Sequence, residues 1–295
     1  MNYDVIIVGG SYAGMAAALQ LLRARRSVLI IDAGKRRNRT ASHAHGFLAQ
    51  EGVDPAELAG AARTQLMVYP TLTWVDEKAE LVAGVRDEFR VTSQGQTYTG
   101  RRLLFAIGVQ DQLPKIPGLQ ERWGQSVFHC PYCHGYELDQ GRIGVIATSF
   151  MSMHQAQLVA EWGETTFFSN HVLEVDQPSA ENLAHRGVCV ESTSIARIEG
   201  SADVVLTDGR ILSFAGLFTA PRNAPASPIA EQFGCKLVET PIGTQLWTSD
   251  AKETSISGAF ACGDVARVPH TLSLAVADGA MAGAQLHRSL IWPDG

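Results

Sequence analysis

Apolar runs of strand length alternate with stretches of small, helix-favouring residues in the first part of the chain. Residues 4–8 are mostly valine and isoleucine, and glycines follow them directly. Residues 15–22 are methionine, alanine, leucine and glutamine, a composition that favours a helix. A second apolar run, residues 27–31, ends at Asp32. The order of strand, glycine turn, helix and strand predicts the unit from which dinucleotide-binding folds are built.

The turn between this first strand and the helix carries candidate chemistry. It reads Gly9-Gly10-Ser11-Tyr12-Ala13-Gly14, so a serine replaces the middle glycine of the G-x-G-x-x-G pattern. Glycines allow a tight turn and let backbone N–H groups approach a pyrophosphate at the positive end of the helix. Asp32 lies eighteen positions after Gly14, where an acidic residue can bind a ribose hydroxyl. An ordinary α/β unit without a ligand is the alternative.

Similar patterns return later in the chain. Residues 258–265 read as a strand that ends in Gly-Asp, and residues 270–282 read as a helix of small residues. Residues 103–108 form another apolar strand that ends in glycine, and the proline-rich residues 113–118 read as a linker. Residues 142–146 then read as the first strand of a second dinucleotide unit. The 295 residues are enough for two modest domains.

Composition narrows the class of protein. Hydrophobic residues make up 45% and charged residues 18% of the chain, as in ordinary globular proteins. A formal net charge of −6 argues against a nucleic-acid partner. Because no apolar run could span a bilayer and the first residues read as a strand, we expect no membrane contact and a cytoplasmic setting. Five cysteines, only two of them closely spaced, form no disulfide framework, so Cys189, Cys235 and Cys262 are expected to be buried.

The segment Cys130-Pro131-Tyr132-Cys133-His134-Gly135-Tyr136-Glu137 is the strongest chemical signal. Two cysteines three positions apart are typical of a redox-active pair. Half of a zinc site or a structural disulfide is the alternative, but zinc needs two more ligands and the sequence has no second C-x-x-C. We expect a helical turn to continue after the pair, which places both sulfurs at a helix N-terminus and lowers the thiol pKa. His134, with an ordinary pKa near neutrality, can accept a thiol proton.

Together these segments resemble the thioredoxin-reductase-like flavoproteins, members of the class II pyridine nucleotide-disulfide oxidoreductase fold. The resemblance implies an α/β protein with two Rossmann-like dinucleotide-binding domains, of which the FAD domain is discontinuous in sequence. It places the FAD domain at residues 1–113 and 244–295, and an NADPH-domain-like domain that carries the C-x-x-C at residues 114–243.

The resemblance also assigns the flavin site. It implies that the Asp264 carboxylate holds the ribityl chain and that Thr271 and Leu272, at a helix N-terminus, face the flavin pyrimidine, where the helix stabilises negative charge. The loop at residues 36–47 falls where the family brings a segment over the flavin. Its His43 and His45 are candidates for active-site groups, but histidines on a surface loop are commoner, and we favour that interpretation. The remaining residues expected at FAD are Gly9, Gly10, Ser11, Tyr12, Ala13, Gly14, Asp32, Ala106, Gly108 and Gly263.

The same resemblance indicates that the second nucleotide-binding site has lost the glycines of its turn. In NADPH-using relatives a G-x-G-x-x-A turn follows the strand, whereas here residues 147–152 read Ala-Thr-Ser-Phe-Met-Ser. Added side chains, above all Phe150, prevent the close backbone approach that a pyrophosphate requires. The next strand ends in Ser169-Asn170-His171, without an arginine pair for a 2′-phosphate. Residues 204–212 read as a plain hairpin with an Asp-Gly turn.

The C-P-Y-C-H-G-Y-E segment resembles most closely the FAD-dependent dithiol oxidases of gliotoxin, holomycin and romidepsin biosynthesis. The resemblance implies that Cys130 exchanges with a small-molecule dithiol, that Cys133 passes electrons to FAD, and that His134 acts as base. Molecular oxygen would accept the electrons and yield hydrogen peroxide. A homodimer is expected from the family.

Two alternatives stay open from the sequence. A disulfide reductase, supplied by NADPH or by a protein electron donor, would run the same chemistry in reverse. A redox sensor without turnover would use the cysteine pair alone. A damaged second nucleotide site together with histidine after the second cysteine favours the oxidase.

Overall fold

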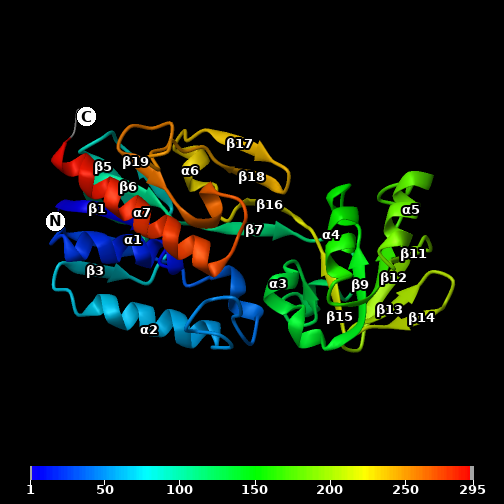
Figure 1. The fold of residues 1–295 in the computed structure, drawn as a ribbon. Coiled ribbons are helices and arrows are strands. Elements are labelled where there is room, and N and C mark those ends of the chain that lie inside the picture. The colour runs from blue at the N-terminus through cyan, green and yellow to red at the C-terminus, as the bar shows by residue number, and fades with distance from the viewer. Residues whose placement is uncertain (1, 293–295) are drawn as a thin grey trace. The chain divides into compact units, whose positions relative to one another are not determined.

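The computed structural model describes residues 2–292, and their contacts divide the chain into two compact units (Figure 1). Unit 1 contains the chain up to Arg39, Phe47–Gln110 and the chain from Asn223 onward. Unit 2 contains Thr40–Gly46 and Asp111–Arg222. The short loop Thr40–Gly46 thus belongs to unit 2 although its sequence neighbours belong to unit 1.

Unit 1 is built on a seven-stranded sheet in the order β3-β2-β1-β6-β5-β4, with β19 pairing to β6. The pairs among β3, β2, β1, β6 and β19 are parallel, and those among β4, β5 and β6 are antiparallel. The strands are β1 (Asn2–Val8), β2 (Val28–Ile31), β3 (Leu72–Val75), β4 (Leu81–Ala83), β5 (Phe89–Ser93), β6 (Gln96–Phe105) and β19 (Ala259–Ala261).

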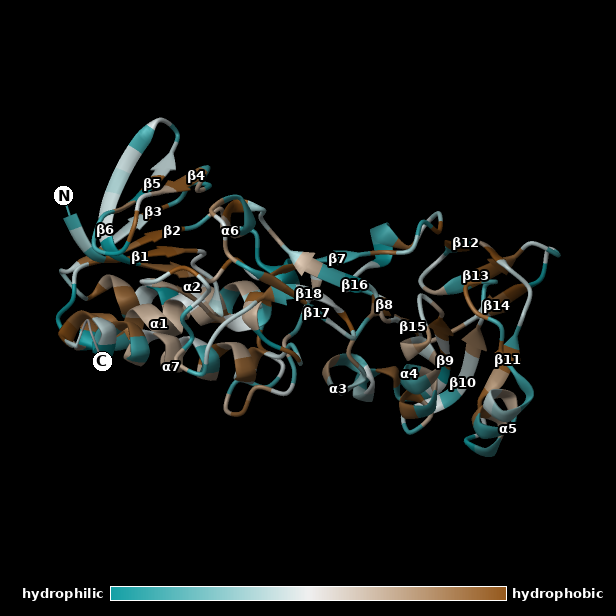
Figure 2. Ribbon diagram, turned by 90° about the horizontal axis from the view of Figure 1, so that it is seen from above, coloured by the Kyte–Doolittle hydropathy of each residue, from teal (hydrophilic) through white to brown (hydrophobic). Residues whose placement is uncertain are grey.

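Three helices cover one face of this sheet, α1 (Tyr12–Arg23), α2 (Pro55–Met67) and α7 (Leu272–Ile291), as Figure 2 shows. Small residues allow α1 and α7 to approach closely. A Cβ atom on Gly279 would collide with the Ala13 carbonyl, and one on Gly283 would collide with the Ala17 backbone. The buried valines and isoleucines of β1 and β2 pack on both faces of the sheet, as central parallel strands do.

A second sheet in the order β17-β18-β16-β7 contains the two strands by which the chain leaves unit 1 and returns to it. Its strands are β7 (Val109–Gln112), β16 (Arg222–Pro225), β17 (Leu237–Thr240) and β18 (Gly243–Leu246), and the short helix α6 (Ile229–Gln232) lies between β16 and β17 in sequence. The contact-based division therefore assigns residues 223–243 to unit 1, whereas the sequence assigned them to the middle domain.

Unit 2 has a parallel sheet in the order β11-β10-β9-β15-β8 and a small antiparallel sheet, β12-β13-β14. Its strands are β8 (Val127–Phe128), β9 (Gln140–Ile146), β10 (Gly163–Phe168), β11 (Cys189–Glu191), β12 (Ile195–Glu199), β13 (Asp203–Leu206), β14 (Ile211–Ser213) and β15 (Gly216–Thr219). Its helices are α3 (Pro131–His134), α4 (Met151–Val159) and α5 (Gln177–His185). The predicted hairpin is confirmed as β13 and β14.

Cysteine burial differs from the prediction at one position. Cys235 and Cys262 are buried as expected, but Cys189 is exposed because β11 is the edge strand of its sheet. Among residues 2–292, no helix combines the length and apolar character needed to cross a membrane.

Candidate redox site

The turn after β1 is shaped around its glycines. Gly9 adopts a φ of +106°, and a Cβ atom there would collide with the carbonyl oxygen of Ala106. A Cβ atom on Gly14 would likewise collide with the Gly9 carbonyl. Ser11 precedes α1 as its N-cap but makes no side-chain capping hydrogen bond, so no serine hydroxyl occupies the first N–H groups of the helix. The turn therefore presents a helix N-terminus suited to a phosphate.

Asp32 fixes this turn to the end of β2. Its Oδ1 accepts a hydrogen bond from the Gly10 N–H at 3.0 Å, and the Gly9 N–H donates to the Ile31 carbonyl at 2.9 Å. The predicted acidic residue thus lies directly beside the predicted turn. Its ribose contact remains a prediction, while its hold on the backbone of Gly10 is visible.

Asp264 carries an unsatisfied buried oxygen. Its Oδ2 accepts a hydrogen bond from Arg37 Nη1 at 3.3 Å, and the same nitrogen lies 2.9 Å from His270 Nδ1. Its Oδ1 is buried and has no hydrogen-bond partner within the described chain. Since buried carboxylate oxygens are nearly always hydrogen-bonded, this atom marks a place for a ligand donor such as a ribityl hydroxyl.

Gly263 brings Asp264 to the first turn. It has a φ of +75°, and a Cβ atom there would lie 2.7 Å from the Ala13 Cβ. Its N–H donates to Asp278 Oδ2 at 2.9 Å, and Lys252 pairs with Asp278 Oδ1 at 2.6 Å. Unit 1 thereby gathers the predicted residues around Gly9, Ala13, Ala106 and Gly263 in one place.

The other predicted flavin residues lie at the ends of elements. Thr271 is the N-cap of α7, and its Oγ1 accepts a hydrogen bond from the Leu274 N–H at 3.1 Å. Leu272 is the first residue of this 20-residue helix. Gly108, with a φ of +65°, follows β6. Together with the orphaned Asp264 oxygen and the glycine turn, this arrangement fits FAD.

The cysteine pair lies in unit 2, directly after β8. Cys130 and Cys133 form a disulfide with their Cα atoms 5.3 Å apart, and α3 is the single turn between Pro131 and His134. The predicted continuous helix is wrong, because α3 ends at His134 and a separate 3-10 turn spans Tyr136–Leu138. The two sulfurs therefore lie at the start of a single helical turn and not of a longer helix.

Gly135 lies between these two turns, at a position with no room for a side chain. A Cβ atom on it would lie 2.6 Å from Trp162 Cδ1 and 2.7 Å from the Pro131 carbonyl oxygen. The ring of Tyr132 meets the same tryptophan edge to face, with centroids 5.2 Å apart. The backbone of the C-x-x-C turn is thus packed directly against an indole.

His134 is an uncharged base at neutral pH. Its ring stacks on Phe128 with centroids 4.2 Å apart and planes inclined by 17°. Burial, followed by the nearby His45, lowers the pKa of His134 from 6.5 to about 4. The expected pKa near neutrality is therefore wrong, because one face of the imidazole has lost its water to a phenyl ring. A neutral imidazole has a free nitrogen that can accept a thiol proton.

His45 belongs to this site, contrary to its interpretation as a surface histidine. Its Nδ1 lies 3.5 Å from Glu137 Oε1, four positions after Cys133, and its side chain is only 17% exposed. The sequence left His45 open as an active-site group but did not indicate its contact with Glu137, since the loop Thr40–Gly46 is far from the cysteines in sequence. Only the pattern of two loop histidines, His43 and His45, hinted at it.

The second nucleotide turn is occupied by its own side chain. Ser152 Oγ accepts hydrogen bonds from the backbone N–H groups of Thr148 at 2.9 Å and Ser149 at 3.4 Å. Phe150 stands before α4 with 74% of its surface exposed. The N–H groups that would bind a pyrophosphate are already used.

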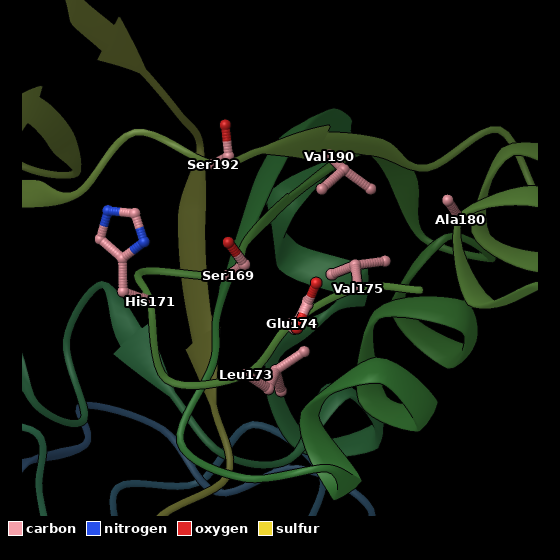
Figure 3. Close-up of a pocket in the computed structure, with 8 residues that line it drawn as sticks. All are labelled: Ser169, His171, Leu173, Glu174, Val175, Ala180, Val190 and Ser192. Atoms are coloured by element: carbon pink, nitrogen blue, oxygen red, sulfur yellow. The ribbon is translucent and has the colours of Figure 1, made fainter. Parts of the chain in front are cut away.

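A pocket of about 420 Å³ lies at the carboxyl ends of β10 and β11 (Figure 3). Its polar lining consists of Ser169, His171, Glu174 and Ser192, and the remaining lining residues are apolar. No lysine or arginine is among the eight residues that line it, so the pocket offers no fixed positive charge to a 2′-phosphate.

Comparison with known proteins gives a consistent result. The profile of a family described as pyridine nucleotide-disulphide oxidoreductase matches residues 3–279. Thioredoxin reductase sirT of Leptosphaeria maculans is 29% identical over 99% of this chain and 95% of its own. Thioredoxin reductase tcpT of Claviceps purpurea is 30% identical over 98% of this chain and 94% of its own.

Solved structures resemble the chain over its whole length. A crystal structure of an oxidoreductase from Agrobacterium tumefaciens is 54% identical, with a TM-score of 0.97 over all of both chains. The crystal structure of HlmI is 30% identical, with a TM-score of 0.91 over 99% of this chain and 94% of that one.

Proposed function

The chain belongs to the pyridine nucleotide-disulphide oxidoreductase family, and from this premise we propose that it is an FAD-dependent dithiol oxidase. It is a flavin-dependent thiol/disulfide oxidoreductase of the thioredoxin-reductase-like group, with FAD as its cofactor. The direction of electron flow is the proposed part. One observation carries it: Ser152 fills the turn that would hold the pyrophosphate of NADPH.

Unit 1 would hold FAD through the glycine turn and Asp264. The N–H groups at the start of α1 would bind the pyrophosphate, and Asp264 Oδ1 would accept from a ribityl hydroxyl. The N-terminus of α7 at Leu272 would stabilise negative charge on the cofactor. When bound, FAD would supply the two-electron acceptor for the reduced Cys130 and Cys133, with molecular oxygen as the final acceptor and hydrogen peroxide as the product.

The substrate steps use the cysteine pair and the adjacent imidazole. His134 takes the proton of one substrate thiol, and the resulting thiolate attacks the Cys130 sulfur. The Cys130–Cys133 bond breaks, and Cys133 leaves as a thiolate. The second substrate thiol then attacks the substrate sulfur of the mixed disulfide, and its proton goes to the Cys130 thiolate that is released. The substrate becomes a cyclic disulfide, and the enzyme holds two reduced cysteines.

His134 suits the oxidation of a dithiol, because its imidazole is neutral when the Cys130–Cys133 disulfide is intact. Burial holds the pKa of His134 at about 4, so its imidazole starts each cycle as an acceptor. Two sulfurs next to one stacked imidazole match a dithiol that loses two protons. The substrate class is therefore a small molecule with two thiols able to close a ring.

Anaerobic mixing of the holoenzyme with dithiothreitol tests the proposal. We expect the flavin absorbance to bleach, and air to restore it with about one peroxide per flavin per cycle. Cys130→Ser and Cys133→Ser should retain the flavin and lose the bleaching. A wild-type flavin that stays oxidised in excess dithiol would rule out the oxidase.

A disulfide reductase is the second candidate, favoured by the names of the relatives sirT and tcpT, which are called thioredoxin reductases. Flavin reduction by NADPH alone would support it. Sedimentation of the holoenzyme tests the predicted homodimer separately.

A further inference from the structure

Gln155 connects α4 to the segment that carries the cysteine pair. It lies within this helix, and only 8% of its surface is exposed. Its Nε2 donates a hydrogen bond to the backbone carbonyl of His129 at 2.9 Å. His129 follows β8 and directly precedes Cys130. A side chain from a separate helix thus holds the backbone one residue before the disulfide.

The other half of this amide has no partner. A carbonyl oxygen can only accept, so the bond to His129 fixes which end of the Gln155 amide faces the backbone. Oε1 is buried without a hydrogen-bond partner among residues 2–292. A buried acceptor without a partner costs free energy, and an apolar side chain at this position would avoid that cost. The bond to His129 is therefore what the amide contributes.

The backbone that Gln155 holds is weakly restrained by its own sheet. β8 has only two residues and pairs with β15, as the outermost strand of the sheet. Its last residue, Phe128, carries the ring that stacks on His134. Short segments with few backbone hydrogen bonds open locally more easily than central strands. The bond from Gln155 thus restrains the point at which the chain leaves β8 and enters the C-x-x-C segment.

We propose that Gln155 is a positioning residue for the cysteine pair: through the His129 carbonyl it holds Cys130 at the distance from Cys133 at which their disulfide closes. The Cα atoms of the two cysteines are 5.3 Å apart, inside the range of about 4.4–6.8 Å that disulfides require. This role rests on the proposed function, because it deepens the assignment of Cys130 and Cys133 as the redox pair. It holds for either direction of electron flow.

Restraint of the backbone favours the disulfide over the two thiols. When the bond between Cys130 and Cys133 is reduced, an unrestrained segment gains conformational freedom, and the two sulfurs meet less often. A backbone held at His129 loses part of that freedom, so the reduced pair closes again more readily. Removing the Gln155 amide should therefore make the disulfide easier to reduce. A purely structural hydrogen bond, equal in both redox states, would support stability and leave this equilibrium unchanged.

Three variants separate these two roles. Gln155→Met keeps about the length of the side chain and removes the amide. Gln155→Asn keeps the amide but is one methylene shorter, so it no longer reaches the His129 carbonyl. Gln157→Met is the matched control, because it makes the same substitution in the same helix at a half-buried position.

The equilibrium is measured on the cysteines themselves. The holoenzyme is equilibrated anaerobically with mixtures of reduced and oxidised dithiothreitol, quenched in acid and alkylated, and mass spectrometry counts the free thiols of Cys130 and Cys133. Each exchange moves two electrons and two protons from dithiothreitol to the pair. We expect Gln155→Met and Gln155→Asn to reach half-reduction at a roughly three- to tenfold lower ratio of reduced to oxidised dithiothreitol, which is the effect of one neutral hydrogen bond. Gln157→Met should match the wild type.

An unchanged ratio in both Gln155 variants would overturn the inference, whether or not their stability in urea falls. An equal shift in Gln157→Met would do the same, since the effect would then belong to α4 as a whole. If Gln155→Met does not fold, Gln155→Asn decides alone. A wild-type flavin that fails to bleach would end the oxidase proposal, while the thiol ratio would still test Gln155, because the dithiothreitol mixture alone sets that equilibrium.

Discussion

Ser152 Oγ lies 2.9 Å from the backbone nitrogen of Thr148 and accepts its hydrogen bond. This single contact replaces, within the chain, what a pyrophosphate does at the corresponding turn of a nucleotide site. At the first turn, the Ser11 side chain makes no such bond to the N–H groups at the start of α1. The two units thus share a fold but differ in which helix N-terminus is available to a phosphate.

NADPH is expected to be a poor reductant of this flavin. Because the N–H groups of Thr148 and Ser149 are bonded to Ser152, NADPH should reduce the flavin at least roughly a hundredfold more slowly than dithiothreitol does at equal concentration. Anaerobic stopped-flow absorbance measures both rates. Equal rates would contradict the oxidase assignment.

Removing the Ser152 hydroxyl should destabilise unit 2 without creating an NADPH site. Ser152→Ala removes a buried hydroxyl and leaves two partly buried backbone donors without their partner, at a cost of about 1–2 kcal/mol in the free energy of unfolding. The variant also keeps the exposed Phe150 side chain beside the turn, where we expect it to obstruct a pyrophosphate. Urea denaturation checks the stability, and Ser213→Ala, in the edge strand β14, provides the comparison.

Asp264 is predicted to hold the flavin through its unpaired buried oxygen. Asp264→Ala should weaken FAD binding by roughly 10- to 100-fold, because a charge-assisted hydrogen bond contributes about 1.5–3 kcal/mol. The flavin-to-protein ratio after gel filtration measures the loss. Glu164→Gln, on an exposed carboxylate of unit 2, should keep a full complement of flavin. Full occupancy in Asp264→Ala would show that the ribityl chain does not depend on this residue.

The depressed pKa of His134 makes stability depend on pH. Between the unfolded value of 6.5 and the folded value of about 4, the unfolded chain binds more protons at this position than the folded chain. The stabilisation is therefore complete above about pH 6.5 and is lost progressively as the pH falls toward 4. His134→Gln should show a shallower loss of stability over that window in urea titrations at several pH values. An identical slope in both proteins would mean that the imidazole is not desolvated.

Local patterns predicted the strands and glycine turns of unit 1 and the cofactor FAD. Gly9, Gly14 and the segment before Asp264 lie next to strands whose apolar pattern fixes their position, so fold and cofactor follow from short-range signals. FAD binding and the thiol/disulfide class are confirmed by the family match. The pKa of His134 was not predictable, because it depends on Phe128 stacking and on a loop far away in sequence.

The other features that the sequence did not predict depend mostly on contacts between side chains that are far apart in sequence. Nothing in the sequence near His45 indicates Glu137 as its neighbour, because the chain must fold before they meet. Ser152 stands at the alanine of the G-x-G-x-x-A pattern, and the sequence did not show that its hydroxyl accepts a hydrogen bond from the turn itself. The end of α3 was also misjudged, since the helical pattern continues through Gly135 while the backbone divides there into two short turns.

Gly135 is predicted to be essential for the geometry of the cysteine pair. Gly135→Ala would place a methyl group 2.6 Å from the Trp162 ring and 2.7 Å from the Pro131 carbonyl oxygen, so α3 or the indole must shift. Overpacking of this kind costs about 1–3 kcal/mol. Since the shift moves the cysteines relative to His134, dithiol reduction of the flavin should slow by roughly tenfold or more.

Gly60→Ala is the matched control, because Gly60 lies in α2 with open space in the direction of its Cβ atom. It should leave the rate of flavin reduction and the stability of the protein unchanged or slightly improved. Because Gly135 lies in unit 2, the FAD content of Gly135→Ala should stay at the wild-type level. A variant with normal dithiol kinetics would show that the packing on Trp162 is unrelated to catalysis.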